Sequence, residues 1–177
     1  MGSAKLWRRA CLLLRAASHM PDPIVSEWRR FGPLSVGGGW LVDESLFAFL
    51  VDFEIHKAQR LRYSLSLVCF AVEGVPAGNE ESVVPPTAEH VARYLRATDA
   101  VTSGAGPWVA LLLVDAESIH LPLILHRLTT QLETSAWSAG GSCYPRTATR
   151  AQDMLSQAVD LMDRAKVEGG NRLYVAS

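Results

Sequence analysis

Apolar positions along this chain alternate between helical spacing and short continuous runs. In the segment 43–60, apolar residues recur every three or four positions with charged residues between them, which predicts an amphipathic helix. Asp43 precedes the first of these apolar residues, Leu46, by three positions and is a suitable N-cap. The segment 64–72 is instead a nearly continuous apolar run with β-branched and aromatic residues, which is typical of a strand buried on both faces.

The rest of the chain continues this alternation of helices and strands. Gly104-Ala105-Gly106-Pro107 separates two short apolar segments and predicts a hairpin, and Gly169-Gly170-Asn171 ends the last predicted helix. The further helices are expected over 87–97, 117–133 and 152–168, and the further strands over 100–103, 108–114, 137–143 and 173–175. We therefore expect an α/β (α+β) sandwich, in which a central β-sheet with mixed strand directions is flanked by helices.

Composition narrows the class of protein. The chain has 177 residues with 49% hydrophobic and 20% charged residues, which suits one globular domain with a sizeable core and a short extension. The net charge of −1 gives no general attraction to nucleic acid, so an anionic ligand must be held by local arginines. No apolar run reaches the length needed to span a bilayer, and we expect no membrane association.

The cysteines and histidines show no metal-site spacing. Cys11, Cys69 and Cys143 are odd in number and far apart, which fits a reducing, cytoplasmic location better than a disulfide framework. His120 and His126 lie six residues apart on one predicted helix and do not share a face, so we interpret both as structural or surface residues.

Residues 1–39 are predicted to be an N-terminal extension and linker, and residues 40–177 the folded domain. Proline and glycine clusters fill the segment 21–39. The basic, apolar segment 5–15 has three interpretations: part of a larger parent protein, vector-derived sequence or a membrane-surface helix. Ser18-His19-Met20 resembles a cloning junction and favours the second, and the short polar face makes the third the weakest.

Several ordered motifs together resemble the GGDEF (diguanylate cyclase) family. Arg96-Ala97-Thr98-Asp99 matches the family's R-x-x-D inhibitory-site motif, and Ala105-Gly106-Pro107-Trp108-Val109 follows five residues later in place of the catalytic G-G-D/E-E-F hairpin. The segment 138–145 is similar to the family's S-I-G-V-A-S-Y-P strand, and 163–172 resembles its ending Y-x-A-K-x-x-G-R-N-R. The resemblance covers about 43–175 and implies a nucleotide-cyclase-like fold.

The departures from the family pattern affect the catalytic positions. A cyclase needs metal-binding carboxylates on the first core strand and in the hairpin, where this chain has Ala71 and Pro107-Trp108. Glu73 alone cannot rebuild a two-metal site. The resemblance therefore implies a degenerate domain that is not an enzyme, with no catalytic residue, no metal site and no cofactor.

The product-binding motif is retained. By the resemblance, Arg96, Asp99 and Arg127 would bind cyclic di-GMP, and we expect all three side chains at the surface. An arginine fork can donate to guanine O6 and N7, and a carboxylate can accept from its N1 and N2 donors. The simpler alternative is that Arg96 and Asp99 form a surface salt bridge of little energetic value.

These observations favour a catalytically inactive GGDEF-like domain that acts as a cyclic di-GMP receptor or effector through its R-x-x-D site. The expected partners are cyclic di-GMP and a protein partner or a second copy of the chain, with no nucleic acid. The first alternative is a ligand-independent dimerisation or protein-interaction module. The second is an active diguanylate cyclase, which Ala71 and Pro107-Trp108 disfavour.

Overall fold

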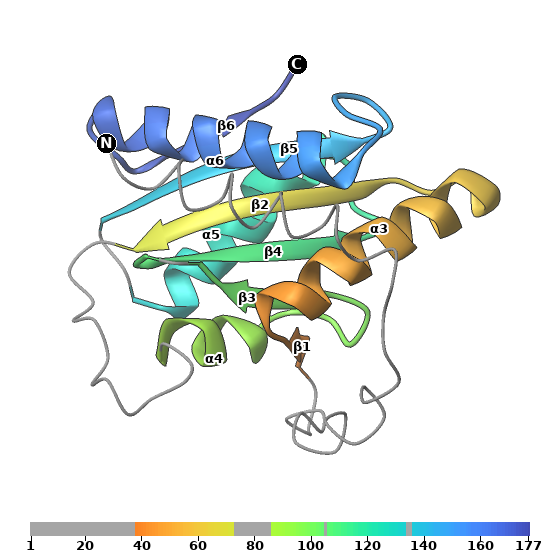
Figure 1. Ribbon diagram of the computed structural model, residues 1–177. Helices are drawn as coiled ribbons and strands as arrows, with labels where there is room; N and C mark the ends of the chain where they lie inside the picture. Colours follow the sequence, from red (N-terminus) through yellow and green to blue (C-terminus); the bar gives the residue numbers. More distant parts are fainter. Residues whose placement is uncertain (1–37, 73–85, 105, 134–135) are drawn as a thin grey trace.

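The computed structural model describes residues 38–72, 86–104, 106–133 and 136–177. They form six strands that alternate with four α-helices and one short 3-10 helix (Figure 1). In chain order the elements are β1 (Trp40–Leu41), α3 (Glu44–Leu61), β2 (Leu65–Val72), α4 (Pro86–Ala92), β3 (Ala100–Ser103), β4 (Trp108–Val114), η1 (Ser118–His120), α5 (Leu121–Gln131), β5 (Trp137–Tyr144), α6 (Ala151–Val167) and β6 (Arg172–Val175).

The six strands form one mixed sheet in the order β1-β3-β4-β2-β5-β6. The four inner strands β3, β4, β2 and β5 pair antiparallel, while the two edge strands β1 and β6 run parallel to their neighbours. The predicted fold class, a mixed sheet flanked by helices, is confirmed.

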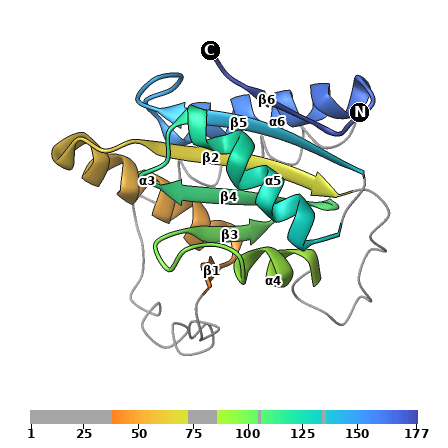
Figure 2. The ribbon, with the colours of Figure 1, turned by 180° about the vertical axis from the view of Figure 1, so that it is seen from behind.

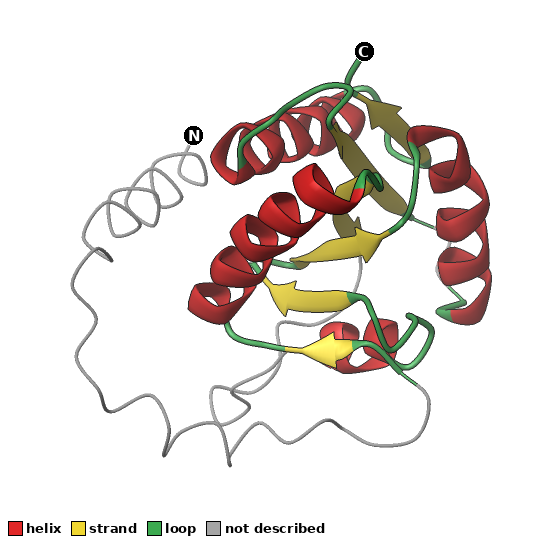
Figure 3. Ribbon diagram, turned by 90° about the vertical axis from the view of Figure 1, so that its right-hand side faces the viewer, coloured by secondary structure: helices red, strands yellow, loops and turns green. Residues whose placement is uncertain are grey.

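Helices cover both faces of the sheet, which Figure 3 shows from the side. Helices α3 and α6 lie on one face, and α4 and α5 lie on the other, which Figure 2 shows from behind. Strand β2 is buried along its whole length because its alternate side chains enter the two cores. Leu67 and Cys69 pack towards α3 and α6, whereas Val68 and Phe70 pack towards α4 and α5. The prediction of a strand buried on both faces is therefore confirmed.

The first helix begins where the sequence predicts. The Asp43 carboxylate accepts a hydrogen bond from the Leu46 N–H at 2.8 Å, as an N-cap should. Phe47, Val51 and Ile55 form the buried face of α3 at spacings of four residues. The prediction of a helix over 43–60 with Asp43 as its cap is confirmed.

The predicted helix over 87–97 is too long by more than one turn, because α4 ends at Ala92. In a longer α-helix the Ala92 carbonyl would accept from the Arg96 N–H. Here that carbonyl accepts from the Gly39 N–H at 2.7 Å, and the Arg96 N–H donates to the Asp99 side chain instead. The chain therefore turns after Ala92 and reaches β3 through a tight loop.

Two further differences concern short elements. Strand β1 has only two residues and was not predicted; it is held because the Trp40 N–H donates to the Asp99 carbonyl and the Val42 N–H to the Val101 carbonyl. The helix predicted over 117–133 is divided into η1 and α5, with Pro122 in the first turn of α5, where a missing N–H is tolerated.

The N-terminal prediction lies almost wholly outside the described residues, since only Gly38 and Gly39 of the segment 1–39 are described. Within the described part of the chain, no helix is both long and apolar enough to cross a membrane. Cys69 and Cys143 are buried free thiols, and burial raises the pKa of both. The cytoplasmic location inferred from the cysteines stays a prediction.

Candidate functional site

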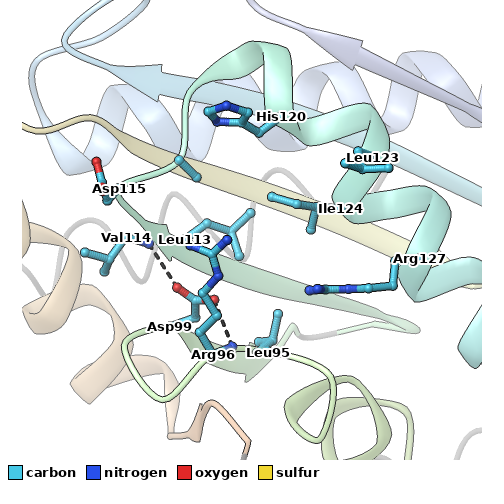
Figure 4. Close-up of a pocket in the computed structure, with 11 residues that line it drawn as sticks. Leu95, Arg96, Asp99, Leu113, Val114, Asp115, His120, Leu123, Ile124 and Arg127 are labelled. Carbon is cyan, nitrogen blue, oxygen red and sulfur yellow. Dashed lines mark hydrogen bonds between the residues drawn. The ribbon is translucent and has the colours of Figure 1, made fainter.

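The three arginine and aspartate residues singled out in the sequence lie around one cavity. The cavity has a volume of about 440 Å³ and lies between the loop from α4 to β3, the end of β4 and the exposed face of α5 (Figure 4). Arg96 and Asp99 come from the loop, and Arg127 comes from the second turn of α5. Residues that are 28 to 31 positions apart in the sequence are thus brought together, as the sequence interpretation requires.

The Asp99 carboxylate is buried and holds the loop together. It accepts hydrogen bonds from the Arg96 backbone N–H at 3.0 Å and the Val114 backbone N–H at 3.1 Å. The expectation that this side chain lies at the surface is wrong, because only 4% of Asp99 is exposed. The two backbone donors draw it inwards and join the loop to the last residue of β4 (Figure 4).

Burial raises the pKa of Asp99 above its ordinary value of 3.8, and the hydrogen bonds from the Arg96 and Val114 N–H groups oppose this rise. Each carboxylate oxygen has lone pairs beyond the one that a backbone N–H uses. The group lines the cavity and therefore keeps acceptor capacity on that side.

The surface salt bridge proposed as the simpler alternative for Arg96 and Asp99 is not formed. Among the described residues, the ion pairs are Lys57 with Glu54 and both Arg164 and Arg172 with Glu168. Arg96 is exposed, and Figure 4 shows its side chain rising from the loop beside Asp99 towards α5. The aspartate binds the arginine's backbone rather than its guanidinium.

Arg127 reaches the same loop from the opposite wall. Its Nη2 donates to the Tyr94 carbonyl at 3.1 Å, across the space between α5 and the end of α4. A guanidinium carries five N–H donors, so this single bond leaves several for a ligand. Figure 4 shows the Arg127 side chain extending over the cavity towards Arg96.

The sequence interpretation missed other residues of the cavity. Leu123 and Ile124 form an apolar part of the wall, and Leu123 is 73% exposed. Asp115 lies at the end of β4 with a positive φ of 54°, and His120 lies at the start of α5. The signal for His120 was present in the sequence, because it precedes Arg127 by seven residues, which is two helical turns.

The hairpin at the other end of the sheet is filled by an indole ring. Trp108 is 4% exposed and belongs to the core beneath α3 and α6. Its ring lies directly on Gly104, where a Cβ atom would overlap the ring carbons. Trp108 pairs in register with Ala71 of β2, which is 1% exposed. Trp108 therefore packs in the core and offers no exposed ring face on which a ligand could stack.

Other positions of the family-like motifs lie outside the described residues or do not line this cavity. Glu73 and Ala105 lie outside the described residues. Lys166 is half-buried on α6, and Gly170 has a positive φ of 70° in the turn after it. Within the described ranges, no group of three or more histidine, cysteine, aspartate or glutamate side chains is placed to hold a metal ion.

Comparison with known sequences identifies no relative: no protein-family model matches the chain, and no curated protein is significantly similar to it. Comparison with solved structures does find similar folds. The GGDEF domain of YfiN (also called TpbB) from Pseudomonas aeruginosa has a TM-score of 0.67 and 18% identity, over 77% of this chain and 97% of that domain.

Two further structures are complexes with the cyclic dinucleotide. A microbial GGDEF domain with cyclic di-GMP has a TM-score of 0.63 and 20% identity, over 76% of this chain and 93% of that one. The GGDEF domain of DgcB from Caulobacter crescentus, also with cyclic di-GMP, has a TM-score of 0.66 and 14% identity, over 91% of this chain and 98% of that one. The described chain therefore has the fold of GGDEF domains. At identities of 14–20%, these similarities establish the fold alone.

Proposed function

We propose that this chain is a catalytically inactive domain of the GGDEF fold that binds cyclic di-GMP as a receptor. The observation that carries the proposal is the meeting of Arg96, Asp99 and Arg127 around one cavity. The sequence motifs and the cavity thus point independently to the same three residues. Two of the similar structures are complexes of GGDEF domains with this ligand, which supports the choice of ligand.

The chemistry of the cavity suits a guanine nucleotide with phosphate groups. The exposed Arg96 guanidinium can donate two hydrogen bonds to guanine O6 and N7. The Asp99 carboxylate keeps lone pairs that can accept from guanine N1 and N2. Arg127 can pair with a phosphate or stack on a base, and Leu123 and Ile124 supply apolar surface for the ring faces.

The proposal of inactivity rests on the opposite part of the domain. Ala71 and Trp108 stand where the resemblance expects metal-binding carboxylates, and both are buried in the core. Neither side chain offers an oxygen ligand to a hard cation. The bulky indole also lies directly on Gly104 of the hairpin, where a Cβ atom would overlap the ring. We expect no formation of cyclic di-GMP from GTP with Mg²⁺ or Mn²⁺, and measurable product would refute this part.

A second candidate function is a ligand-independent interaction module, and two observations favour it. The Asp99 carboxylate already has two backbone donors, so its presence is explained by folding alone. Phe49 and Phe53 stack on the outer side of α3 with ring centroids 6.0 Å apart and are about half exposed, at 52% and 49%. Exposed aromatic pairs are common in protein interfaces. This candidate would leave Arg96 and Arg127 without a ligand.

Calorimetric titration with cyclic di-GMP separates the two candidates. We expect saturable binding to the wild-type protein and a loss of about ten- to hundredfold in affinity for Arg96→Ala, because a bidentate guanine contact is removed. Arg93→Ala is the matched control, since Arg93 is an exposed arginine near the end of α4 that does not line the cavity. Wild-type protein without saturable binding at high micromolar ligand would favour the interaction module.

A further inference from the structure

The cavity wall contributed by η1 and α5 carries polar groups at both ends. His120, Leu123, Ile124 and Arg127 all line the cavity. Their spacings of three, four and seven residues place them on one helix face. Seven residues of α-helix rise about 10 Å, so His120 and Arg127 mark the two ends of this face. Figure 4 shows them above and to the right of Arg96, which rises from the opposite wall.

The hydrogen bonding of His120 fixes which ring nitrogen carries the proton. The Nδ1 atom accepts a hydrogen bond from the Glu117 backbone N–H at 3.2 Å, as part of the cap at the start of η1. A nitrogen that accepts a hydrogen bond carries no proton, so the neutral ring has its N–H at Nε2. No described residue accepts a hydrogen bond from Nε2, and the side chain is exposed at the cavity.

We infer that His120 is a specificity-determining residue, which donates its Nε2–H to a second phosphate group of the ligand while Arg127 pairs with the first. This inference rests on the proposed function and deepens it. With one donor at each end of this wall, the site is suited to a ligand with two separated phosphates. A mononucleotide has one phosphate and can satisfy only one end of the wall. His120 is thus the residue that favours a cyclic dinucleotide over guanosine monophosphate.

Two substitutions separate ligand binding from helix capping. In His120→Asn the amide oxygen occupies roughly the place of Nδ1 and can still accept from the Glu117 N–H, but the donor at Nε2 is lost. In His120→Gln the amide nitrogen can reach roughly the place of Nε2, but the acceptor for the cap is lost. His126→Ala is the matched control, because His126 is an exposed histidine of α5 that does not line the cavity.

The experiment measures the dissociation constants of cyclic di-GMP and guanosine monophosphate for each variant of the 177-residue chain. We expect His120→Asn to weaken cyclic di-GMP binding about tenfold or more, as for a hydrogen bond to a charged group. Guanosine monophosphate binding should be unchanged, and both His120→Gln and His126→Ala should bind cyclic di-GMP within about threefold of wild type.

The possible failures are distinguishable. If Arg96→Ala weakens binding but His120→Asn binds both ligands as the wild type does, the inference is overturned and the proposed function stands. Equal weakening of both ligands by His120→Asn would also overturn the inference, because His120 would then act only through the fold. If the wild-type protein binds no cyclic di-GMP, the proposed function fails and the inference fails with it.

Discussion

Removal of the Asp99 carboxylate tests whether this side chain is mainly structural. In Asp99→Ala, the backbone N–H groups of Arg96 and Val114 both lose their acceptor at a position that is 4% exposed. The loop would then no longer be joined to the end of β4. We expect the domain to lose stability as well as ligand affinity.

The size of the loss follows from the two bonds. A hydrogen bond to a charged group contributes about 1.5–3 kcal/mol to stability, so two of them set an upper range of about 3–6 kcal/mol. Burial of the carboxylate has a cost, which the raised pKa of Asp99 reflects, and this cost disappears with the side chain. We therefore expect a net loss of about 3 kcal/mol, which lowers the thermal midpoint by about 6–12 °C for a chain of this size.

Urea unfolding and thermal melting, followed by circular dichroism, measure this loss directly. Arg96→Ala is the control, because its side chain is exposed at the same loop and should change stability by less than about 0.5 kcal/mol. Asp99→Asn should lie between the two, since an amide oxygen can accept from one backbone N–H while the amide nitrogen faces the other. If Asp99→Ala and Arg96→Ala have the same thermal midpoint, the structural role assigned to this carboxylate is wrong.

Three further predictions concern the core and the effect of pH. Trp108→Ala should destabilise the domain by about 3–5 kcal/mol, because a fully packed indole leaves a cavity beneath α3 and α6; a midpoint within a degree or two of wild type would contradict this. Gly140→Ala should cost about 1–3 kcal/mol, because its Cβ would overlap the backbone of α6 at Ala158 and Met162, whereas Gly141→Ala, which meets the movable Leu121 side chain, should cost less. Burial raises the pKa of Asp99 above 3.8. As the pH is lowered, the carboxylate therefore gains a proton at a pH above 3.8, and cyclic di-GMP binding should weaken there. The folded state binds this proton more tightly than the unfolded state, so the extra stability that protonation of Asp99 gives is present at acid pH and is lost as the pH rises through its folded-state pKa. Ligand titrations and urea unfolding at a series of pH values measure the two effects. Compared with Asp99→Asn, which has no carboxylate to titrate at this position, the wild type should lose ligand affinity on acidification without losing stability through Asp99.

The sequence pattern predicted element boundaries correctly where neighbouring residues determine them. The strands of the hairpin were predicted with the bounds that the structure shows, because Gly104 and Pro107 interrupt two runs of apolar residues. The start of α3 was equally predictable, since Asp43 provides its own acceptor for the Leu46 N–H. In both cases the residues that fix the boundary are neighbours in the sequence.

The sequence pattern predicted the wrong local structure where residues distant in the sequence determine it. The end of α4 depends on the Gly39 N–H, which takes the Ala92 carbonyl from more than fifty residues away in the sequence. The burial of Asp99 depends in the same way on the Val114 N–H at the end of β4. The grouping of Arg96, Asp99 and Arg127 was anticipated only through the resemblance, because spacing along the chain carries no information about the distance between a loop and a helix.

The indole that fills the hairpin has a consequence for how this domain could change over evolutionary time. Trp108 and Ala71 face each other in register on adjacent strands and belong to one core. A carboxylate introduced at either position alone would be a buried charge without a metal or a partner, and so would strongly destabilise the fold. Replacement of the indole alone would open a cavity. Carboxylates for a metal ion could therefore be introduced at this pair only through intermediates less stable than the present protein, so the packing of the two residues opposes such a change.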